Sequence, residues 1–599
     1  MPITYRFKQR QTQLEKPFNK DTLKKLWKKK VRGQVRSMSI RDLHDFYDFH
    51  RRLDDNASKI NERVLSGQYK VQVPLIYDLE KKFGICRHMI ALSPSDSLVL
   101  QALIQPFADN LISKAPSMHA YYSRDKDVAL KLPHEMGSKY DDWFFKWKLY
   151  QKEILLFTET KKYIITTDLS NYYDSIRLRE LRSVISSYIN CDEVLLDLLF
   201  DTIENLSWRP DYLPNQSIGL PVINLESIRL LAHSFLFEID YVLKNQFKEN
   251  FVRWMDDIII GVNDIDEAKQ ILKGISDVLK SRGLSLNMSK TKIFTSEEAK
   301  RNFLFNENSI LDDFDKNKPS QDNFIKEFKM HWNDNKQYRY FDKVLKRFLT
   351  IASNYKFPVL LEYLHKIFED YSGIRTNVCS YLYSLGFNKE SAEVFKSLLE
   401  IKQYDDISLF LLVSLATDWD IGHSDDGKNF IDQTLKYLKK LPIKDREFNF
   451  YSYLWFAAKY EQPQQLYNHL NKYQNFWIRS PFLTRQVASI LPRLLPNFGK
   501  EYEELSNFIL QRDYNDSSSV IYNFKEIRTA ENIRYLKEYL FPANKHKKGY
   551  PLSKFLILYN FLLNGSSNKY IDIRKEISKH IQDSWFLSWL KELDNVPLT

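Results

Sequence analysis

The hydrophobic and polar positions of this chain follow two different patterns. In its first half, short apolar runs rich in β-branched residues, such as Tyr163–Thr167, are separated by polar turns, which is typical of strands. From about residue 320 onwards, apolar residues recur at three- and four-residue spacing, as in Val344, Phe348 and Ile351, which indicates helices that bury one face. The pattern predicts an α+β unit over residues 71–310, followed by an all-α unit over residues 320–599.

The all-α unit contains a succession of helical segments joined by short polar turns, from Tyr340 to Leu593. Helix pairs of this kind stack into α-solenoids, so we expect a helical-repeat domain of HEAT-like character. An irregular helical bundle is the alternative, because no repeat period stands out. The concave face of such a stack would suit an extended partner, which would be the product strand, RNA or another subunit.

The first 70 residues differ from the rest of the chain in charge. They hold 18 Lys and Arg against 8 Asp and Glu, an excess of 10 in a chain whose net charge is +11. We expect a basic helical extension over residues 1–70 that binds nucleic acid, with phosphate contacts beside Trp27 as a stacking ring. A solvated helix face is the alternative. Ser39–Leu65 is predicted to be helical. The basic cluster consists of Lys24, Lys25, Lys28, Lys29, Lys30, Arg32 and Arg36.

Two adjacent carboxylates, Asp256 and Asp257, lie between the apolar runs of Phe251–Val262. Apolar β-prone runs with a short polar break predict a hairpin, so both carboxylates would be held side by side near an apolar sheet. Like charges in that setting repel each other and lose hydration. A hard cation such as Mg²⁺, for which carboxylates are natural ligands, would compensate for them. A solvated turn is the other explanation of an isolated Asp-Asp pair.

A second strand carries another carboxylate. Tyr163–Thr167 is apolar and β-branched, and it ends at Asp168. Two-metal phosphoryl transfer needs carboxylates from separate elements, because both ions clamp the attacking and leaving oxygens about 4 Å apart. Asp168, Asp256 and Asp257 are therefore predicted to form the catalytic centre and to bind two Mg²⁺ ions, with Mn²⁺ as the alternative ion.

These segments occur in an order that resembles a known family. Lys81–Arg87 resembles the fingers of bacterial reverse transcriptases, and the strands that carry Asp168 and Asp256 resemble the palm. Gly219-Leu220-Pro221 lies between the two strands, and Gly283–Ile293 (GLSLNMSKTKI) resembles the segment that follows the catalytic hairpin. The resemblance covers about residues 70 to 305 and implies a right-hand-like fingers and palm fold.

The resemblance also implies roles for single residues. Tyr173 matches the aromatic residue under the sugar of the incoming nucleotide, where a ring collides with a 2′-hydroxyl and selects deoxynucleotides. Arg87 matches the fingers arginine that binds the triphosphate, because a planar guanidinium suits phosphate. Lys290 is expected to neutralise or protonate the leaving pyrophosphate. The alternatives are core packing for Tyr173 and solvated surface positions for Arg87 and Lys290.

One segment departs from the family pattern. After Gly219-Leu220-Pro221 the chain continues with Val222-Ile223, where reverse transcriptases usually have a second glycine. The β-branched residues add bulk where the backbone would approach a base pair, so we expect unconventional or absent templating. Departures of this kind are typical of the abortive-infection and defence-associated reverse transcriptases of bacteria, which combine a palm with a C-terminal helical-repeat domain.

The function implied by this resemblance is an antiphage-defence DNA polymerase that adds dNTPs to a 3′-hydroxyl or to a hydroxyl of the protein itself, for example that of Tyr47. Its partners would be dNTPs, single-stranded DNA product, a non-coding RNA, and further subunits as a homo-oligomer or with a second reverse transcriptase. The alternatives are templated copying of a companion RNA, and an inactive palm kept as a nucleic-acid-binding scaffold. Three mutually repelling carboxylates argue against the inactive scaffold.

Other features of the sequence limit the compartment. The N-terminus has no apolar stretch typical of a secretion signal, and no apolar run approaches the roughly 18 residues of a membrane span. Cys86, Cys191 and Cys379 are few and far apart, which favours neither disulfides nor a zinc cluster. We therefore expect a cytoplasmic protein without membrane contact.

Overall fold

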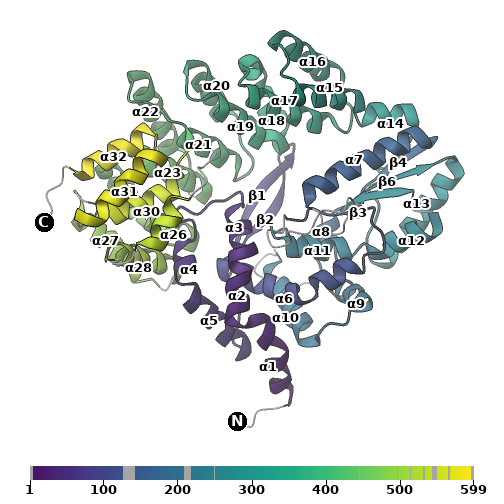
Figure 1. Ribbon diagram of the computed structural model, residues 1–599, viewed down its shortest axis with the longest axis horizontal. Helices are drawn as coiled ribbons and strands as arrows, with labels where there is room; N and C mark the ends of the chain where they lie inside the picture. The colour runs from purple at the N-terminus through teal and green to yellow at the C-terminus, as the bar shows by residue number, and fades with distance from the viewer. Residues whose placement is uncertain are drawn as a thin grey trace.

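The computed structural model of the chain describes residues 5–125, 142–207, 217–247, 250–443, 446–495, 497–512, 515–529, 533–542, 549–563 and 567–594. Three parts surround a central two-stranded hairpin: a set of N-terminal helices, an α+β domain and an all-helical domain (Figure 1). The helical domain arches from the α+β domain, past the hairpin, to the N-terminal helices, so the first and last parts of the chain lie side by side.

The N-terminal part is helical, as predicted, but with an interruption. Ser39–Leu65 is not one continuous helix, because Asp45 and Phe46 take φ values of 54° and 50°. This left-handed conformation cannot continue a right-handed helix, so helix resumes only at Tyr47. The elements are α1 (Tyr5–Phe18), α2 (Lys20–Leu26), the π-helical segment η1 (Trp27–Val31), α3 (Arg32–Arg36), α4 (Tyr47–Arg51) and α5 (Leu53–Leu65).

The α+β domain contains two sheets. The fingers hairpin consists of β1 (Leu75–Lys82) and β2 (Ile85–Ala91), and the palm sheet has the strand order β3-β5-β6-β4-β7. The palm strands are β3 (Ala120–Tyr121), β4 (Tyr163–Thr167), β5 (Phe251–Trp254), β6 (Asp257–Val262) and β7 (Lys292–Thr295). The helices are α6 (Pro94–Ser113), α7 (Trp143–Thr160), α8 (Tyr172–Ser175), α9 (Leu178–Tyr188), α10 (Glu193–Leu206), α11 (Glu226–Ser234), α12 (Phe237–Phe247), α13 (Ile265–Ser281), α14 (Ser296–Asn302) and α15 (Phe305–Lys316).

The palm strands are apolar because the sheet is covered on both faces. Ile164 and Ile259 belong to the core that contains α7, whereas Ile165, Ile258 and Ile260 belong to the core that contains α11, α12 and α13. Successive side chains of a strand point to opposite faces, so a strand covered on both sides is a continuous apolar run. This burial leaves the strand ends as the place where polar residues reach solvent.

The fingers hairpin turns through Phe83 and Gly84, whose φ values are 55° and 75°. A two-residue loop with positive φ at both positions matches the right-handed twist of the flanking strands. The turn is therefore tight, and it leaves the ring of Phe83 84% exposed at the tip.

The helical domain begins after the palm. The inner helices α17, α19, α21, α23, α26, α28 and α30 pack against one another in succession. This order of packing is the one expected of stacked helix pairs, whereas a regular HEAT-like repeat stays a prediction. No helix among the described residues combines the length and apolarity needed to cross a membrane. The elements are α16 (Gln321–Asp334), α17 (Phe341–Tyr355), η2 (Pro358–Tyr363), α18 (Leu364–Asp370), η3 (Ser372–Ile374), α19 (Arg375–Leu385), α20 (Lys389–Glu400), α21 (Ser408–Asp418), α22 (Asp425–Lys440), α23 (Glu447–Tyr460), α24 (Pro463–Lys472), α25 (Gln474–Trp477), α26 (Pro481–Ile490), η4 (Leu491–Leu494), α27 (Gly499–Leu510), α28 (Asn515–Thr529), α29 (Arg534–Leu540), α30 (Leu552–Leu562), α31 (Ser567–His580) and α32 (Ser584–Asp594).

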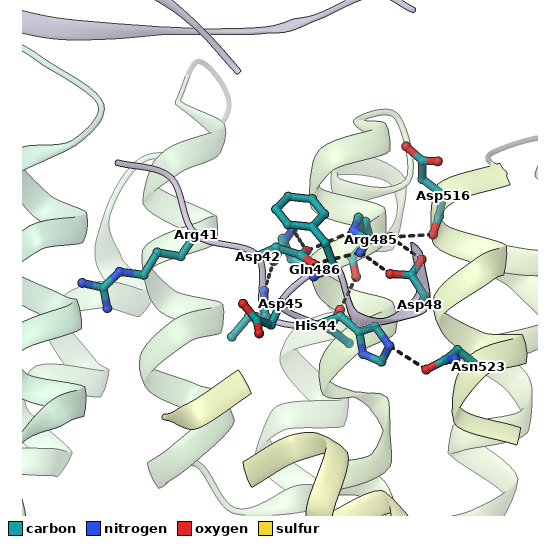
Figure 2. Close-up of polar contacts among 12 residues, drawn as sticks. Arg41, Asp42, His44, Asp45, Asp48, Arg485, Gln486, Asp516 and Asn523 are labelled. Carbon is teal, nitrogen blue, oxygen red and sulfur yellow. Dashed lines mark hydrogen bonds and ion pairs between the residues drawn. The ribbon is translucent and has the colours of Figure 1, made fainter. Parts of the chain in front are cut away.

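A buried arginine joins the helical domain to the N-terminal part. Arg485 of α26 places its guanidinium between Asp42 and Asp48, and its Nη2 lies 2.8 Å from an oxygen of each (Figure 2). The neighbouring Gln486 accepts a hydrogen bond of 2.9 Å from the backbone of Leu43. Planar guanidinium groups bind two carboxylates with good geometry, so this contact orients the two parts relative to each other.

A second buried arginine joins the helical domain to the fingers. Arg375 of α19 donates to Glu80 of β1 at 2.7 Å, and both side chains are at most 5% exposed. The backbone of Asp78 in the same strand donates to Asp406 at 2.7 Å. The fingers hairpin is therefore docked on the helical domain as well as on the palm.

Candidate active site

The three aspartates predicted to be catalytic lie at one edge of the palm sheet. β4 and β6 are antiparallel, with Thr167 opposite Ile258, so Asp168 follows β4 at the point where Asp257 begins β6. Asp256 occupies the turn between β5 and β6 beside Met255, whose φ is 54°. A left-handed backbone conformation is strained for any residue other than glycine. It persists only where the surrounding structure holds it. The hairpin and the strand predicted from the sequence are both present.

Two of these carboxylates, Asp168 and Asp256, lie within electrostatic reach of each other. Burial, together with the negative charges of Asp168 and Asp257, raises the pKa of Asp256 to about 7. Asp168 itself is only 3% exposed. A proton or a cation between Asp168 and Asp256 relieves their repulsion, so this pair fits a hard divalent cation. Across the described residues, no set of three or more His, Cys, Asp or Glu side chains converges as a metal site.

Asp257 differs from the other two aspartates in its partner. Its Oδ1 accepts a hydrogen bond of 2.6 Å from Nη2 of Arg339, in the connection between α16 and α17. The carboxylate is 35% exposed. The structure therefore brings all three aspartates to one edge but gives Asp257 a guanidinium partner.

The segment Gly283–Ile293 holds the end of β4 in place. The backbone N–H of Asn287 donates to the carbonyl of Asp168 at 2.7 Å, and the hydroxyls of Thr167 and Thr291 are 2.7 Å apart. Lys290 forms an ion pair with Asp168, although its side chain is 60% exposed. Lys290 therefore lies beside Asp168, while its expected role towards the leaving pyrophosphate stays a prediction.

Tyr173 and Arg87 lie within electrostatic reach of each other. Burial raises the pKa of Tyr173 to about 12, and Asp256 adds to the shift while Arg229 and Arg87 oppose it. Arg87 is an exposed residue of β2. Lys81 of β1 lies within electrostatic reach of Arg87, Asp174 and Asp256, and burial lowers its pKa. Lys81, which had not been singled out from the sequence, therefore lies near Asp256, whereas Arg87 lies near Tyr173.

Arg253 holds the turn between β5 and β6, which carries Asp256. It is fully buried, its Nε donates to Asp240 at 2.7 Å, and its Nη1 donates to the carbonyl of Met255 at 2.8 Å. Burial raises the pKa of Asp240, and the guanidinium of Arg253 opposes that shift. Sequence reasoning overlooked this residue, although an arginine inside an apolar strand is itself a signal of a buried partner.

Val222-Ile223 was expected to place bulk beside a base pair, but the side chain of Ile223 lies elsewhere. Ile223 is 4% exposed, and the carbonyl of Val222 accepts a hydrogen bond of 3.0 Å from the backbone of Ile90. The segment joins the palm to β2, because apolar β-branched side chains fill the space between them. Ile223 therefore points into the core, and the steric argument against templating does not hold for this side chain.

The basic N-terminal cluster is divided between surface and interior. Lys25, Lys28 and Lys29 are exposed, whereas Lys30 is half-buried. Lys24 pairs with Asp54 at 2.5 Å, Arg32 lies 3.1 Å from His50, and Arg36 pairs with Asp45 at 2.7 Å. Nucleic-acid binding by the cluster stays a prediction, for which the three exposed lysines are the best placed.

Two aromatic residues of this region are buried. Trp27 is fully buried and donates to His50 at 3.3 Å, so its expected role as a stacking ring for bases is wrong. Tyr47 is 4% exposed and its ring stacks on Tyr539 with centroids 4.2 Å apart. A hydroxyl in that position is not accessible to a nucleotide, so Tyr47 is excluded as a priming residue.

Comparison with protein families identifies the class of the α+β unit. Residues 79–321 match the family described as "Reverse transcriptase (RNA-dependent DNA polymerase)". The chain therefore contains a reverse transcriptase domain, which includes the fingers hairpin, the palm sheet and the three aspartates. The match ends before Arg339 and before most of the helical domain.

Comparison with solved structures and with curated proteins does not narrow the class of the chain further. The chain is similar to the telomerase of Candida albicans, solved with a TWJ fragment of telomeric RNA, at 11% identity and a TM-score of 0.29. The alignment covers 74% of this chain and 67% of that chain. A likeness of this size carries no argument about function. No curated protein matches the chain.

Proposed function

We propose that this protein is a DNA polymerase of antiphage defence that adds dNTPs to a 3′-hydroxyl or to a protein hydroxyl. The observation that supports the chemistry most directly is the closeness of Asp168, which follows β4, to Asp256 in the turn between β5 and β6, within the reverse transcriptase domain. The defence role follows from the resemblance to abortive-infection reverse transcriptases with a helical C-terminal domain. Nucleotidyl transfer in general is what the reverse transcriptase domain supports.

The residues around this pair suit a triphosphate. Asp168 and Asp256 would hold Mg²⁺, which supplies charge neutralisation at the transferred phosphate. Arg87 and Lys81 of the fingers would bind the phosphates through charge-assisted hydrogen bonds. Tyr173 would lie against the sugar and exclude a 2′-hydroxyl. Lys290, which is paired with Asp168 in this structure, would neutralise the leaving pyrophosphate.

The test is an extension assay on the purified chain with Mg²⁺ and each labelled dNTP, with and without prior nuclease treatment of bound RNA. The matched control is the double variant Asp256→Ala/Asp257→Ala. Product that survives RNA removal and stays attached to protein until protease treatment supports untemplated synthesis primed by the protein. Equal signals from wild type and control would overturn polymerase chemistry at these aspartates and favour the scaffold.

Templated copying of an RNA is the second candidate. It is favoured by the burial of Ile223, because the steric argument against templating does not apply to a side chain in the core. The exposed Lys25, Lys28 and Lys29 offer a surface for an RNA backbone. Product that requires RNA in the same assay, with a sequence complementary to that RNA, assigns this activity instead.

The defence role is tested in cells. Bacteria that express the wild-type chain should lower phage plaque numbers or stop growing upon infection, whereas cells with the Asp256→Ala/Asp257→Ala variant should not. Equal plaque numbers across a broad set of phages would contradict a defence function. Self-association, a second reverse transcriptase subunit and cytoplasmic location stay predictions, which size analysis and purification from the native cell would examine.

A further inference from the structure

The helical domain reaches into the candidate active site through one arginine. Arg339 lies 18 residues beyond residue 321, where the match to the reverse transcriptase family ends. Its guanidinium donates to Asp257 at 2.6 Å, and its side chain is 24% exposed. The contact therefore links Asp257, the last aspartate of the hairpin, to a part of the chain beyond the match to the reverse transcriptase family.

The backbone of Arg339 is fixed to the palm by its neighbours. Its N–H donates to Oδ1 of Asn302 at 3.2 Å, and the N–H of Tyr340 lies 3.4 Å from the carbonyl of Asn302. The buried ring of Tyr340 packs edge-on against Phe303, with centroids 4.9 Å apart. Fixing the backbone limits where the guanidinium can reach, so the side chain of Arg339 is kept within reach of Asp257.

Aromatic side chains lie near the Arg339–Asp257 pair, which remains partly exposed. Trp147 and Tyr150 of α7 pack against Trp254, the residue that ends β5. Lys343, in the first turn of α17, lies over the rings of Tyr340 and Trp147, at 3.8 and 4.4 Å from their centroids. Charges beside such aromatic walls interact more strongly than charges in open solvent.

The three aspartates are thus compensated in different ways. Asp168 is paired with Lys290, a 60% exposed side chain that can move away, whereas Asp257 is paired with Arg339, which is 24% exposed and whose backbone is held by Asn302. A paired carboxylate adds less to the negative potential that attracts a divalent cation, and it cannot turn freely towards one.

We propose that Arg339 is a positioning residue that neutralises and orients Asp257, so that Asp168 and Asp256 are left as the cation-binding pair. The helical domain thereby sets the cation affinity of the polymerase centre. The catalytic meaning of this contact rests on the proposed function, but its electrostatic effect is measurable without any polymerase reaction.

The experiment titrates the full chain with Mn²⁺ and measures free and bound ion by electron paramagnetic resonance. The variants are Arg339→Gln, which removes the charge, and Arg339→Lys, which keeps it. Arg347→Gln is the matched control, because Arg347 belongs to the same helical domain, in α17, but pairs with Asp312 and Asp315 on α15. We expect Arg339→Gln to bind Mn²⁺ about three- to tenfold more tightly, because one cation beside the aspartates has been removed. Arg339→Lys and Arg347→Gln should stay within about twofold of wild type.

The overturning result is Mn²⁺ affinity that is the same in Arg339→Gln as in wild type, or weaker. If the wild-type chain binds no Mn²⁺, the metal-dependent part of the proposed function fails, and a double-mutant cycle still decides the role of Arg339. In that cycle the melting temperatures of Arg339→Gln, Asp257→Asn and the double variant are compared. We expect the double variant to melt no lower than the less stable single variant. Losses that add in full would show that the two residues act independently, and would refute the proposal.

Discussion

The helical domain touches the rest of the chain through arginines in two different settings. Where it docks on the fingers and on the N-terminal part, Arg375 and Arg485 are buried with their acidic partners. At the catalytic edge, Arg339 is 24% exposed and its partner Asp257 is 35% exposed. Lys290, which forms an ion pair with Asp168, is 60% exposed.

Because the two groups of ion pairs differ in burial, we expect them to have different roles. Breaking a buried pair leaves a charge without water or partner, so such a pair fixes how two domains sit together. A half-exposed pair can exchange its partner for water or for an incoming cation at little cost. The docking contacts are therefore expected to govern stability, and the catalytic contacts to govern ion binding and turnover.

Removal of the docking arginine tests the first half of this comparison. Arg485→Met leaves Asp42 and Asp48 buried without a cation, so we expect the free energy of unfolding to fall by about 3–5 kcal/mol. Denaturant unfolding followed by circular dichroism measures the change, with Arg347→Gln as the surface control. A loss no larger than that of the control would show that the buried cluster does not hold the domains together.

Removal of a catalytic carboxylate tests the second half. Asp256→Asn should lower the rate of dNTP incorporation about 10²–10³-fold, the size expected when a positioned charge at a phosphoryl-transfer site is removed. Its melting temperature should stay equal to wild type or rise, because a repulsion with Asp168 is lost. Single-turnover incorporation and a thermal melt on one preparation give both numbers. A variant that melts early and loses activity in proportion would contradict the separation of roles.

Tyr173 tests selection at the same edge. Its ring is near Asp256 and Arg87, so Tyr173→Ala should admit ribonucleotides and reduce the preference for dNTPs by about 10- to 100-fold. The readout is the ratio of kcat/KM for a dNTP and the matching rNTP, and Tyr173→Phe is the control that keeps the ring. If the alanine variant discriminates as strongly as wild type, the ring packs in the core without contacting the sugar.

The smallest effect is expected in the acid dependence of stability. Burial alone would raise the pKa of Asp48, but the guanidinium of Arg485 outweighs it and holds that pKa below the ordinary value. A carboxyl whose pKa is depressed by folding adds stability that is complete above its unfolded pKa, about 4, and is lost as the pH falls below it. Wild type should therefore lose melting temperature below about pH 4. In Arg485→Met the unpaired Asp48 should have a raised pKa, so this contribution should reverse sign. Parallel curves for the two proteins would contradict the assignment.

The sequence determined the elements whose signal is local. Tyr163–Thr167 and Phe251–Val262 are apolar at successive positions because both faces of the palm sheet are buried, and their acidic ends follow directly in the chain. The helices beyond residue 320 were equally evident from their spacing. The order of the segments sufficed to indicate a reverse transcriptase domain, because each segment is defined within a few residues.

The tertiary structure decided which aromatic and β-branched side chains are buried. Trp27, Tyr47 and Ile223 are apolar residues next to polar ones, and such a pattern fits a binding surface as well as a core. Their burial depends on His50, Tyr539 and Ile90, and the partner of Tyr47 is almost 500 residues away in the chain. No local pattern contains that information.

The pairing of charges was decided only in three dimensions. Arg339 and Asp257 are separated by 82 positions, and Arg485 and Asp42 by 443. An ion pair depends on distance in space and on the water around it, and neither leaves a period or a motif in the sequence. The sequence therefore indicated which carboxylates the candidate centre contains, while the packing of the helical domain against the palm decided that Asp257 is paired with Arg339.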